Sequence, residues 1–249
     1  MKTDGALIEL FSVDVITAET KSFFRDNFTI DLNDIDFNFI GGKQSGLTAS
    51  LFSACAFRCA AADSAVAESD KTAAAQKLAA AAADYLNMQP QCAAFGRATA
   101  QNGYINFKFG EEYLKAVLKQ YAKEFDSLYK IGEFEQYFYG NETKASGMRR
   151  YCINRIISVC DMFEKQNSCS LEPTDRFCGE LQMNLAEQCV FSLGQREMTK
   201  NDAGKNSEIV ASIFYEADSC IKNASMIYLE LYKACAYVLH VLIMKEDKN

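Results

Sequence analysis

The chain has 249 residues, of which 49% are hydrophobic and 24% are charged. This balance excludes wholesale disorder and is typical of one large or two modest globular domains. The formal net charge is −7, from 26 lysines and arginines against 33 aspartates and glutamates. A negative net charge disfavours indiscriminate binding to polyanions, because it repels phosphate, but it does not exclude a local basic site. The single histidine, His240, excludes a histidine-based metal cluster.

Ten cysteines occur without a leader-like N-terminus, because the first ten residues lack a basic stretch followed by a continuous apolar one. We therefore expect reduced thiols and a cytoplasmic protein. Cys55 and Cys59 lie one helical turn apart, which is typical of buried cysteines that pack as small hydrophobes. A redox or metal role for this pair is the alternative. We predict no metal site and no cofactor.

The first half predicts an α+β domain over residues 1–130, a small sheet with helices on one face. After an initial helix, the expected elements are a strand at 36–40, helices at 45–67 and 72–86, strands at 92–98 and 104–109, and a helix at 111–129. Gln101-Asn102-Gly103 predicts a turn between the last two strands, because Asn and Gly tolerate positive φ.

The second half predicts an all-α helical bundle over residues 148–249, after a linker at 131–147 with loop composition. Apolar residues at helical spacing predict helices at 148–163, 175–193, 207–221 and 226–245, and the polar stretch 194–206 predicts a loop. The most apolar run, 226–244, is interrupted by charged residues, so we expect no membrane span.

Three weaker patterns have structural explanations. Gly41–Gly46 lacks the spacing of a phosphate-binding loop and carries Gln44 where that loop needs Ser or Thr, so a strand-to-helix turn is expected. His240 has no recognisable catalytic partner on its apolar helix. Glu111 and Glu112 are expected to complement a helix dipole.

The segment Arg149-Arg150-Tyr151-Cys-Ile-Asn-Arg155 is the strongest cationic cluster in this acidic chain. On a helix, Tyr151 and Arg155 share one flank. Tyrosine supplies a stacking plane and arginine a bidentate phosphate contact, a pairing suited to single-stranded RNA loops. The alternative is a surface arginine whose aliphatic stem covers the edge of the core.

Two separated stretches resemble the arginyl-tRNA synthetase family. Gly103-Tyr-Ile-Asn-Phe-Lys-Phe109, followed by Glu112-Tyr-Leu114, is similar to the strand that closes the family's N-terminal additional domain, and 42–62 and 72–85 are similar to its preceding helices. Tyr151-Cys-Ile-Asn-Arg155-Ile156 resembles the start of the family's DALR-type anticodon-binding domain, and 228–239 resembles its last helix.

The resemblance implies two tRNA-contacting domains without the synthetase core between them. Only residues 126–147 separate them, whereas a nucleotide-binding domain needs about 100 residues or more. The family's histidine and lysine motifs are also missing from the sequence. The implied tRNA-contacting residues are Tyr104, Asn106, Arg149, Arg150, Tyr151 and Arg155.

We therefore expect a non-catalytic tRNA-binding module, with tRNA-Arg as the candidate species and no membrane partner. The alternative is a protein-interaction or oligomeric adaptor that retains the fold but not RNA binding. Its support is the net charge of −7 together with the aromatic residues between Phe134 and Tyr139, which could form a partner surface.

Overall fold

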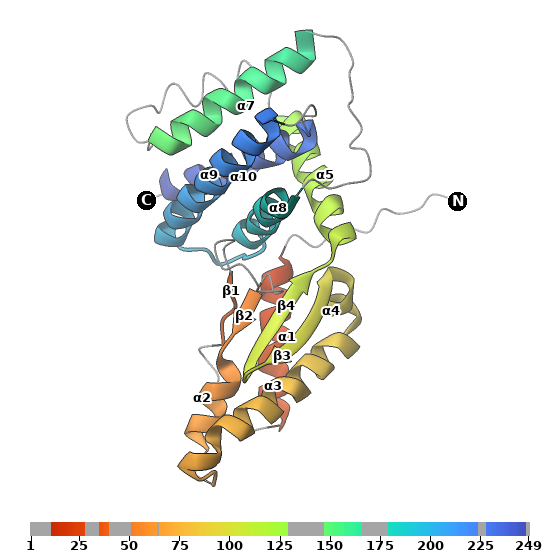
Figure 1. Ribbon diagram of the computed structural model, residues 1–249, viewed down its shortest axis with the longest axis vertical. Helices are drawn as coiled ribbons and strands as arrows, with labels where there is room; N and C mark the ends of the chain where they lie inside the picture. The colour runs from red at the N-terminus through yellow and green to blue at the C-terminus, as the bar shows by residue number, and fades with distance from the viewer. Residues whose placement is uncertain are drawn as a thin grey trace, which may run out of the picture. The chain divides into compact units, whose positions relative to one another are not determined.

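The computed structural model describes residues 11–27, 35–39, 51–63, 65–128, 147–165, 179–223 and 228–247 (Figure 1). The chain divides into two compact units, one comprising Glu9–Leu114 and Gly194–Arg196, the other mainly Lys115–Leu193 and Glu197–Asn249. We call them the α+β unit and the helical unit. Each is described by itself.

The α+β unit holds helices around a small antiparallel sheet, as the sequence predicts. Its elements are α1 (Ser12–Asn27), β1 (Asn38–Phe39), β2 (Leu51–Ser53), α2 (Cys55–Ala62), a 3₁₀ turn (Glu68–Asp70), α3 (Lys71–Met88), α4 (Pro90–Phe95), β3 (Gly96–Gln101) and β4 (Tyr104–Phe109). The strand order is β1-β2-β4-β3, and every neighbouring pair is antiparallel.

One face of this sheet forms the core of the unit. Alternate residues of β4 point into it, and Ile105, Phe107 and Phe109 are almost fully buried. Helix α3 packs against β3 and β4, with α1 packed against α3 and α4 (Figure 1). The buried face of α3 consists of Ala75, Ala79, Ala82, Ala83 and Leu86. These small side chains let the helix approach the strands closely, which fixes this face of the sheet as the inner one.

A two-residue turn joins β3 to β4, where the sequence predicts one. Asn102 has φ of 52° and Gly103 has φ of 81°. Two consecutive positive φ angles are typical of the type I′ turn, whose twist matches that of the flanking strands. The turn therefore fixes the register of the hairpin, in which Gln101 faces Tyr104 and Arg97 faces Lys108.

Strand β3 lies at the edge of the sheet, and its outer side hydrogen-bonds to a side chain of α3 at one residue. The Asn87 amide donates to the Ala98 carbonyl oxygen at 2.9 Å and accepts from the Ala98 amide at 2.9 Å. One side chain of α3 thus makes both backbone hydrogen bonds that a neighbouring strand would make at this residue.

The helical unit confirms the predicted helical second half. It contains most of α5 (Glu111–Leu128), with α7 (Gly147–Lys165), α8 (Gly179–Leu193), α9 (Lys200–Asn223) and α10 (Leu229–Asp247). Helix α9 packs against α7, α8 and α10, and α10 also packs against α7 and α8. Phe214 of α9 and Tyr232 of α10 are among the largest fully buried side chains.

Three element predictions are wrong in detail. Residues 51–53, expected in a helix, form β2 because Leu51 and Ser53 are buried in the alternating pattern of a strand paired with β4. Residues 92–95, expected in a strand, belong to α4, where Pro90 occupies the first turn and Cys92 and Phe95 are buried at helical spacing.

The third error concerns the expected loop at 194–206, because α9 already begins at Lys200. Thr199 and Asp202 form a reciprocal cap there: the Thr199 amide donates to the Asp202 carboxylate at 3.2 Å, and the Asp202 amide donates to the Thr199 hydroxyl at 3.2 Å. This capping box supplies partners for amides at the helix start. Its sequence pattern, Thr-x-x-Asp at residues 199–202, marks this helix start.

The expected linker at 131–147 and the glycine-rich turn at 41–46 lie almost wholly outside the described residues. In the part of the chain that is described, no helix combines the length and the apolar character needed to cross a bilayer.

Candidate nucleic-acid interface

The two site residues predicted in the first half lie on the same face of β4. Because side chains alternate along a strand, Tyr104, Asn106 and Lys108 point away from the face that carries Ile105, Phe107 and Phe109. Tyr104 is 40% exposed and Asn106, in the middle of the sheet, is 9% exposed. The structure thus places Tyr104 and Asn106 together, on the side opposite the core.

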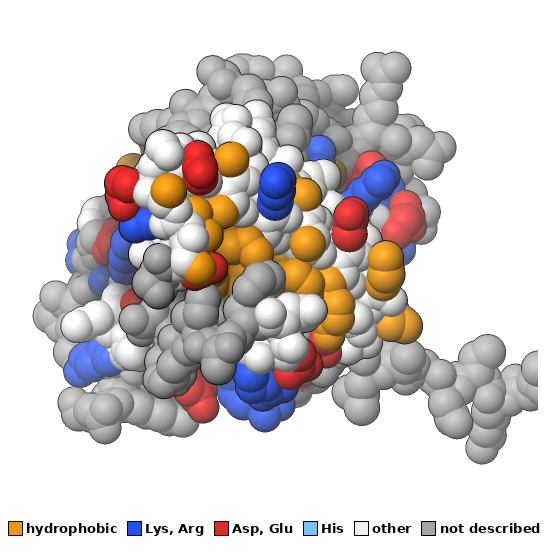
Figure 2. All heavy atoms as spheres, turned by 90° about the horizontal axis from the view of Figure 1, so that it is seen from below, with side chains coloured by type: hydrophobic (Ala, Val, Ile, Leu, Met, Phe, Trp, Pro, Cys, Tyr) orange, Lys and Arg blue, Asp and Glu red, His pale blue; other side chains and the backbone are white. Residues whose placement is uncertain are grey.

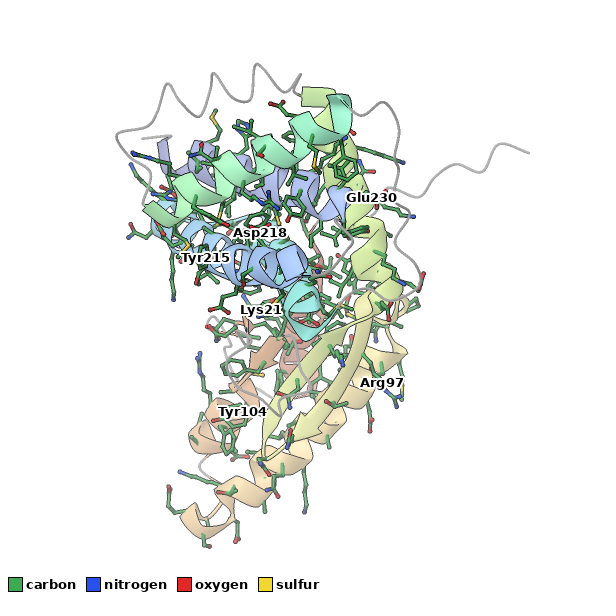
Figure 3. The ribbon with its side chains drawn as sticks, turned by 45° about the horizontal axis from the view of Figure 1, so that its top comes forward. Lys21, Arg97, Tyr104, Tyr215, Asp218 and Glu230 are labelled. Atoms are coloured by element: carbon green, nitrogen blue, oxygen red, sulfur yellow. The ribbon has the colours of Figure 1, made fainter. Side chains whose placement is uncertain are left out.

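The strand register extends this face across the sheet. Asn106 lies between Thr99 of β3 and Phe52 of β2, while Gln101 faces Tyr104 and Arg97 faces Lys108. We call this surface the open sheet face; its members are Phe52, Arg97, Thr99, Gln101, Tyr104, Asn106 and Lys108. Figure 3 shows Arg97 toward one end of the β3–β4 ladder and Tyr104 toward the other.

The Tyr104 ring is held by two other aromatic rings. Its centroid lies 6.1 Å from that of Phe52 and 5.2 Å from that of Phe57, with interplanar angles of 62° and 63°. Edge-to-face contacts of this kind stabilise a ring orientation without covering the whole ring. At Gly103 there is no room for a side chain, because a Cβ atom would lie 2.5 Å from the Phe57 ring. Tyr104 is therefore an ordered, partly exposed aromatic surface.

Arg97 and Lys108 are the only charged residues in the four described strands, and both are exposed. They face each other directly across β3 and β4. Within the described residues, neither has an ion pair with a carboxylate. Like charges opposite each other in an antiparallel pair are destabilising. A bound anion would remove this repulsion.

The concentration of positive charge at this pair is local. On the face of the molecule seen from below, acidic and basic side chains lie on several sides of a group of hydrophobic ones (Figure 2). This mixed distribution agrees with the net charge of −7. Any attraction of a polyanion must then come from particular pairs such as Arg97 and Lys108, because the protein as a whole repels negative charge.

The predicted arginines of α7 have a different environment. Arg149 is 9% exposed and its guanidinium lies 2.9 Å from the Glu246 carboxylate and 3.0 Å from that of Glu208. It also donates to the Ser207 hydroxyl at 3.2 Å. These contacts join α7 to α9 and to the end of α10, so the charge of Arg149 is balanced inside the helical unit.

Tyr151 and Arg155 meet at one carboxylate, that of Asp218 on α9, which is fully buried. Asp218 accepts hydrogen bonds from the Tyr151 hydroxyl at 2.8 Å, the Arg155 Nε at 2.9 Å and the Tyr232 hydroxyl at 2.5 Å. Burial and the neighbouring carboxylate raise the pKa of Tyr232 far above its usual value. Burial lowers the pKa of Arg155, but its hydrogen bond to Asp218 and the carboxylate charge outweigh this effect and raise it overall.

Of the predicted cluster on α7, Arg150 is the member exposed on the helix surface. Tyr151 also packs edge-to-face on the half-exposed Tyr215 ring, with centroids 4.8 Å apart. Figure 3 shows Tyr215 and Asp218 in their places on α9. The structure thus brings Tyr151 and Arg155 together, as their spacing predicts, but at a buried carboxylate.

The cysteines and the histidine considered for redox, metal or catalytic roles are wholly or partly buried. Burial raises the pKa of the Cys55 thiol to about 11 and that of Cys59 to about 12, so both are protonated at neutral pH and fit the packing role. Burial lowers the pKa of His240. In the described ranges, no three His, Cys, Asp or Glu side chains come together as a metal site would require.

Four residues of these two environments are not among those predicted from the sequence: Phe52, Arg97 and Lys108 on the open sheet face and Asp218 in the helical unit. For Arg97 and Lys108 a signal existed, because in a hairpin turning at Asn102-Gly103 they fall opposite each other, on the Tyr104 side. No local signal identifies Asp218, whose partner Arg155 is 63 residues away.

Comparison of the chain with protein-family models, with curated proteins and with solved structures gives no match.

Proposed function

We propose that this chain is a non-catalytic tRNA-binding module that contacts RNA with the open sheet face. The observation that carries the proposal is the Arg97–Lys108 pair: two exposed cations face each other, without a carboxylate partner among the described residues, four residues along β4 from an exposed tyrosine. The repulsion between Arg97 and Lys108 destabilises the sheet slightly. A phosphate bound between the two cations would offset this repulsion, which supports a phosphate-binding role for the pair.

The residue types of the open sheet face suit RNA. Arg97 and Lys108 can pair with phosphate oxygens. Tyr104 offers a ring on which an unpaired base stacks, an interaction worth about 1–3 kcal/mol per base. Gln101 and Thr99 add polar groups between these positions. The resemblance of 103–109 to the closing strand of a tRNA-contacting domain supports the same surface.

In this proposal the helical unit contributes little direct phosphate binding through Arg149 and Arg155, because carboxylates already neutralise both charges. Tyr151 is likewise hydrogen-bonded to Asp218. Arg150 remains the candidate RNA contact of α7, since it is exposed on the helix surface. We assign Arg149, Tyr151 and Arg155 to holding α7, α9 and α10 together.

The test is a titration of labelled tRNA over a range of salt concentrations. Binding should weaken as salt rises, with log K falling by roughly 0.7–0.9 per phosphate contact. The double variant Arg97→Ala with Lys108→Ala should reduce that slope by about 1.5.

The matched control is Lys77→Ala with Lys119→Ala, which removes the same charge from exposed positions on α3 and α5. It should leave the slope nearly unchanged. Absence of tRNA binding at low salt, or an equal effect of both double variants, would overturn the proposal.

A second candidate, the protein-interaction adaptor, is favoured by the neutralised arginines of α7. A helical unit that resembles an RNA-binding domain but has internally paired arginines could have kept its fold for a protein partner. Sedimentation of the pure protein addresses this candidate. A self-associating protein that does not bind tRNA supports the adaptor, whereas a monomer that binds tRNA supports the first proposal.

A further inference from the structure

We infer that Cys189 of α8 and Cys235 of α10 form a redox-responsive pair, which a peroxide converts into a disulfide that crosslinks the two helices and stabilises the helical unit against unfolding. This inference does not depend on the proposed function, because it concerns the interior of the helical unit and no RNA contact. It is argued from the distance between the two sulfurs, their burial and the helices that they join.

The two sulfur atoms already lie in contact. The Sγ atoms of Cys189 and Cys235 are 3.9 Å apart, and one thiol donates a hydrogen bond to the other. A disulfide needs about 2.05 Å between its sulfurs, so each atom would have to move by about 1 Å. A change of side-chain rotamer about the Cα–Cβ bond moves a sulfur further than this. Because α8 and α10 also pack against each other, the pair is placed for a bond between these helices.

A third buried thiol of the helical unit, Cys152 of α7, is oriented differently. Burial, the hydrogen-bonded thiol of Cys189 and the charge of Cys152 all raise the pKa of Cys235. The Cys152 Sγ, however, donates a hydrogen bond to the Ala211 carbonyl oxygen of α9 at 3.1 Å. Cys189 is therefore the partner that directly contacts Cys235.

The oxidation balances with hydrogen peroxide as the oxidant. One sulfur, as the thiolate, attacks the peroxide; an S–O bond forms, the O–O bond breaks, and the products are a sulfenic acid and hydroxide. The second sulfur then attacks the sulfenic sulfur, so that the S–S bond forms and the S–O bond breaks, and the departing oxygen leaves as water. In total the two thiols lose two electrons and two protons, and one peroxide becomes two water molecules.

Burial makes the pair slow to react. Both side chains are fully buried, and burial raises the pKa of Cys235, so the reactive thiolate is scarce at neutral pH. Cys220 of α9 is exposed and should be oxidised first. Once one sulfur of the buried pair is oxidised, its neighbour is already in contact with it. The disulfide should therefore form in preference to higher oxidation states of sulfur.

The crosslink would enclose a whole helix. Cys189 and Cys235 are 46 positions apart, and the segment between them contains α9, which packs against α7, α8 and α10. A disulfide that closes a loop of this length restricts the unfolded chain more than the folded one. Oxidation should therefore raise Tm by roughly 5 °C or more.

The experiment treats the full chain, purified under reducing conditions, with hydrogen peroxide at neutral pH. Remaining thiols are blocked with iodoacetamide, and the protein is digested with trypsin and a glutamate-specific protease. Cleavage after Glu187 and Lys233 places Cys189 and Cys235 in different peptides, so mass spectrometry identifies their crosslink. This crosslink should be the main disulfide within the chain, Tm should rise, and dithiothreitol should reverse both changes.

The same treatment of the urea-unfolded chain is the control for proximity. There the crosslink of Cys189 to Cys235 should be at least tenfold less abundant, because ten cysteines compete as partners. The inference would be overturned by any of three results: no crosslink although Cys220 is oxidised, a predominant crosslink through Cys152, or a crosslink that leaves Tm unchanged.

Variants connect the rise in Tm to this pair. Cys189→Ala and Cys235→Ala should each lose the rise on oxidation, whereas Cys92→Ala, which removes an equally buried thiol from the α+β unit, should keep it. If one variant of the pair does not fold, the other variant and the crosslink in the unmodified protein still decide the question. An equal rise in all three variants would show that a different oxidation causes it.

Discussion

The cations of the open sheet face and those of helix α7 have opposite environments. Arg97 and Lys108 face each other with no acidic partner among the described residues, whereas Arg149 and Arg155 each lie within 3.0 Å of a carboxylate oxygen. The α7 cluster is the more conspicuous in the sequence, with three arginines in seven residues. The difference shows that the local density of positive charge is a poor guide to a phosphate site when distant acidic residues can neutralise it.

The largest expected effect tests whether the α7 cluster is structural. Asp218→Ala leaves Arg155 and two tyrosine hydroxyls without their common acceptor. Removing one partner of a buried ion pair should lower the free energy of unfolding by about 3 kcal/mol. Urea unfolding followed by far-UV circular dichroism measures this change.

The control for that experiment is Asp161→Ala, which removes a partly exposed carboxylate of α7 and should change stability by less than about 0.5 kcal/mol. If Asp218→Ala and Asp161→Ala lowered the free energy of unfolding by similar amounts, the hydrogen bonds of the buried Asp218 network would not contribute to stability.

Alkaline titration is the next largest effect and reports on the same network. The folded-state pKa of Tyr232 is raised, so the stabilising neutral form is fully present below about pH 10, the ordinary tyrosine pKa. As pH rises above 10, only the unfolded chain releases this proton, and stability should fall by up to about 1.4 kcal/mol per pH unit.

In Tyr232→Phe this contribution to the pH slope is absent, and the difference between the two proteins isolates it. Buried thiols such as Cys152, whose pKa is raised to about 12, contribute equally to both. Identical slopes between pH 10 and 11 in urea titrations would show that Tyr232 is not the titrating group.

A matched pair of arginine variants sharpens the comparison directly. Arg149→Ala removes the partner of Glu246 and the donor to Ser207, and should cost about 1–2 kcal/mol of unfolding free energy. Arg97→Ala removes a repulsive neighbour of Lys108 and should change stability by no more than about 0.5 kcal/mol, in the stabilising direction. Thermal and urea unfolding of both variants measure the contrast, and a larger loss for Arg97→Ala would reverse our assignment.

The smallest expected effect is a gain in stability. Lys108→Glu converts a like-charge pair into an opposite-charge pair across β3 and β4, which should raise the free energy of unfolding by about 0.5 kcal/mol. The same variant should lose tRNA affinity. A protein that becomes more stable as it loses binding would identify Lys108 as a residue kept for a ligand. Unchanged affinity would remove Lys108 from the interface.

Much of the fold follows from local patterns in the sequence. The type I′ turn at Asn102-Gly103, the alanine face of α3 and the apolar stripes of α5 and α10 are recognisable because each depends on residues close together in the chain. The strand predicted at 92–98 failed for a physical reason: its first residues pack as a helical turn that begins at Pro90. A short apolar run can satisfy either structure, and tertiary contacts decide between them.

In the candidate site, too, the features that depend on neighbouring residues could be predicted from the sequence, and those that depend on distant residues could not. Tyr104 and Asn106 could be placed on one surface because alternation along a single strand is a local property. The neutralisation of Arg149 by Glu246 joins residues 97 positions apart. The sequence therefore predicts which residue types are available, but the acidic partners that balance them depend on how the helices pack.

The side-chain amide of Asn87 has a consequence for the protein at high concentration. An exposed strand edge can recruit the same edge of another molecule, and repetition of that step builds a fibril. By taking both backbone groups of Ala98, Asn87 opposes the addition of a strand to this part of β3. The open sheet face then lies beside an edge at which Ala98 has no backbone group left for a further strand.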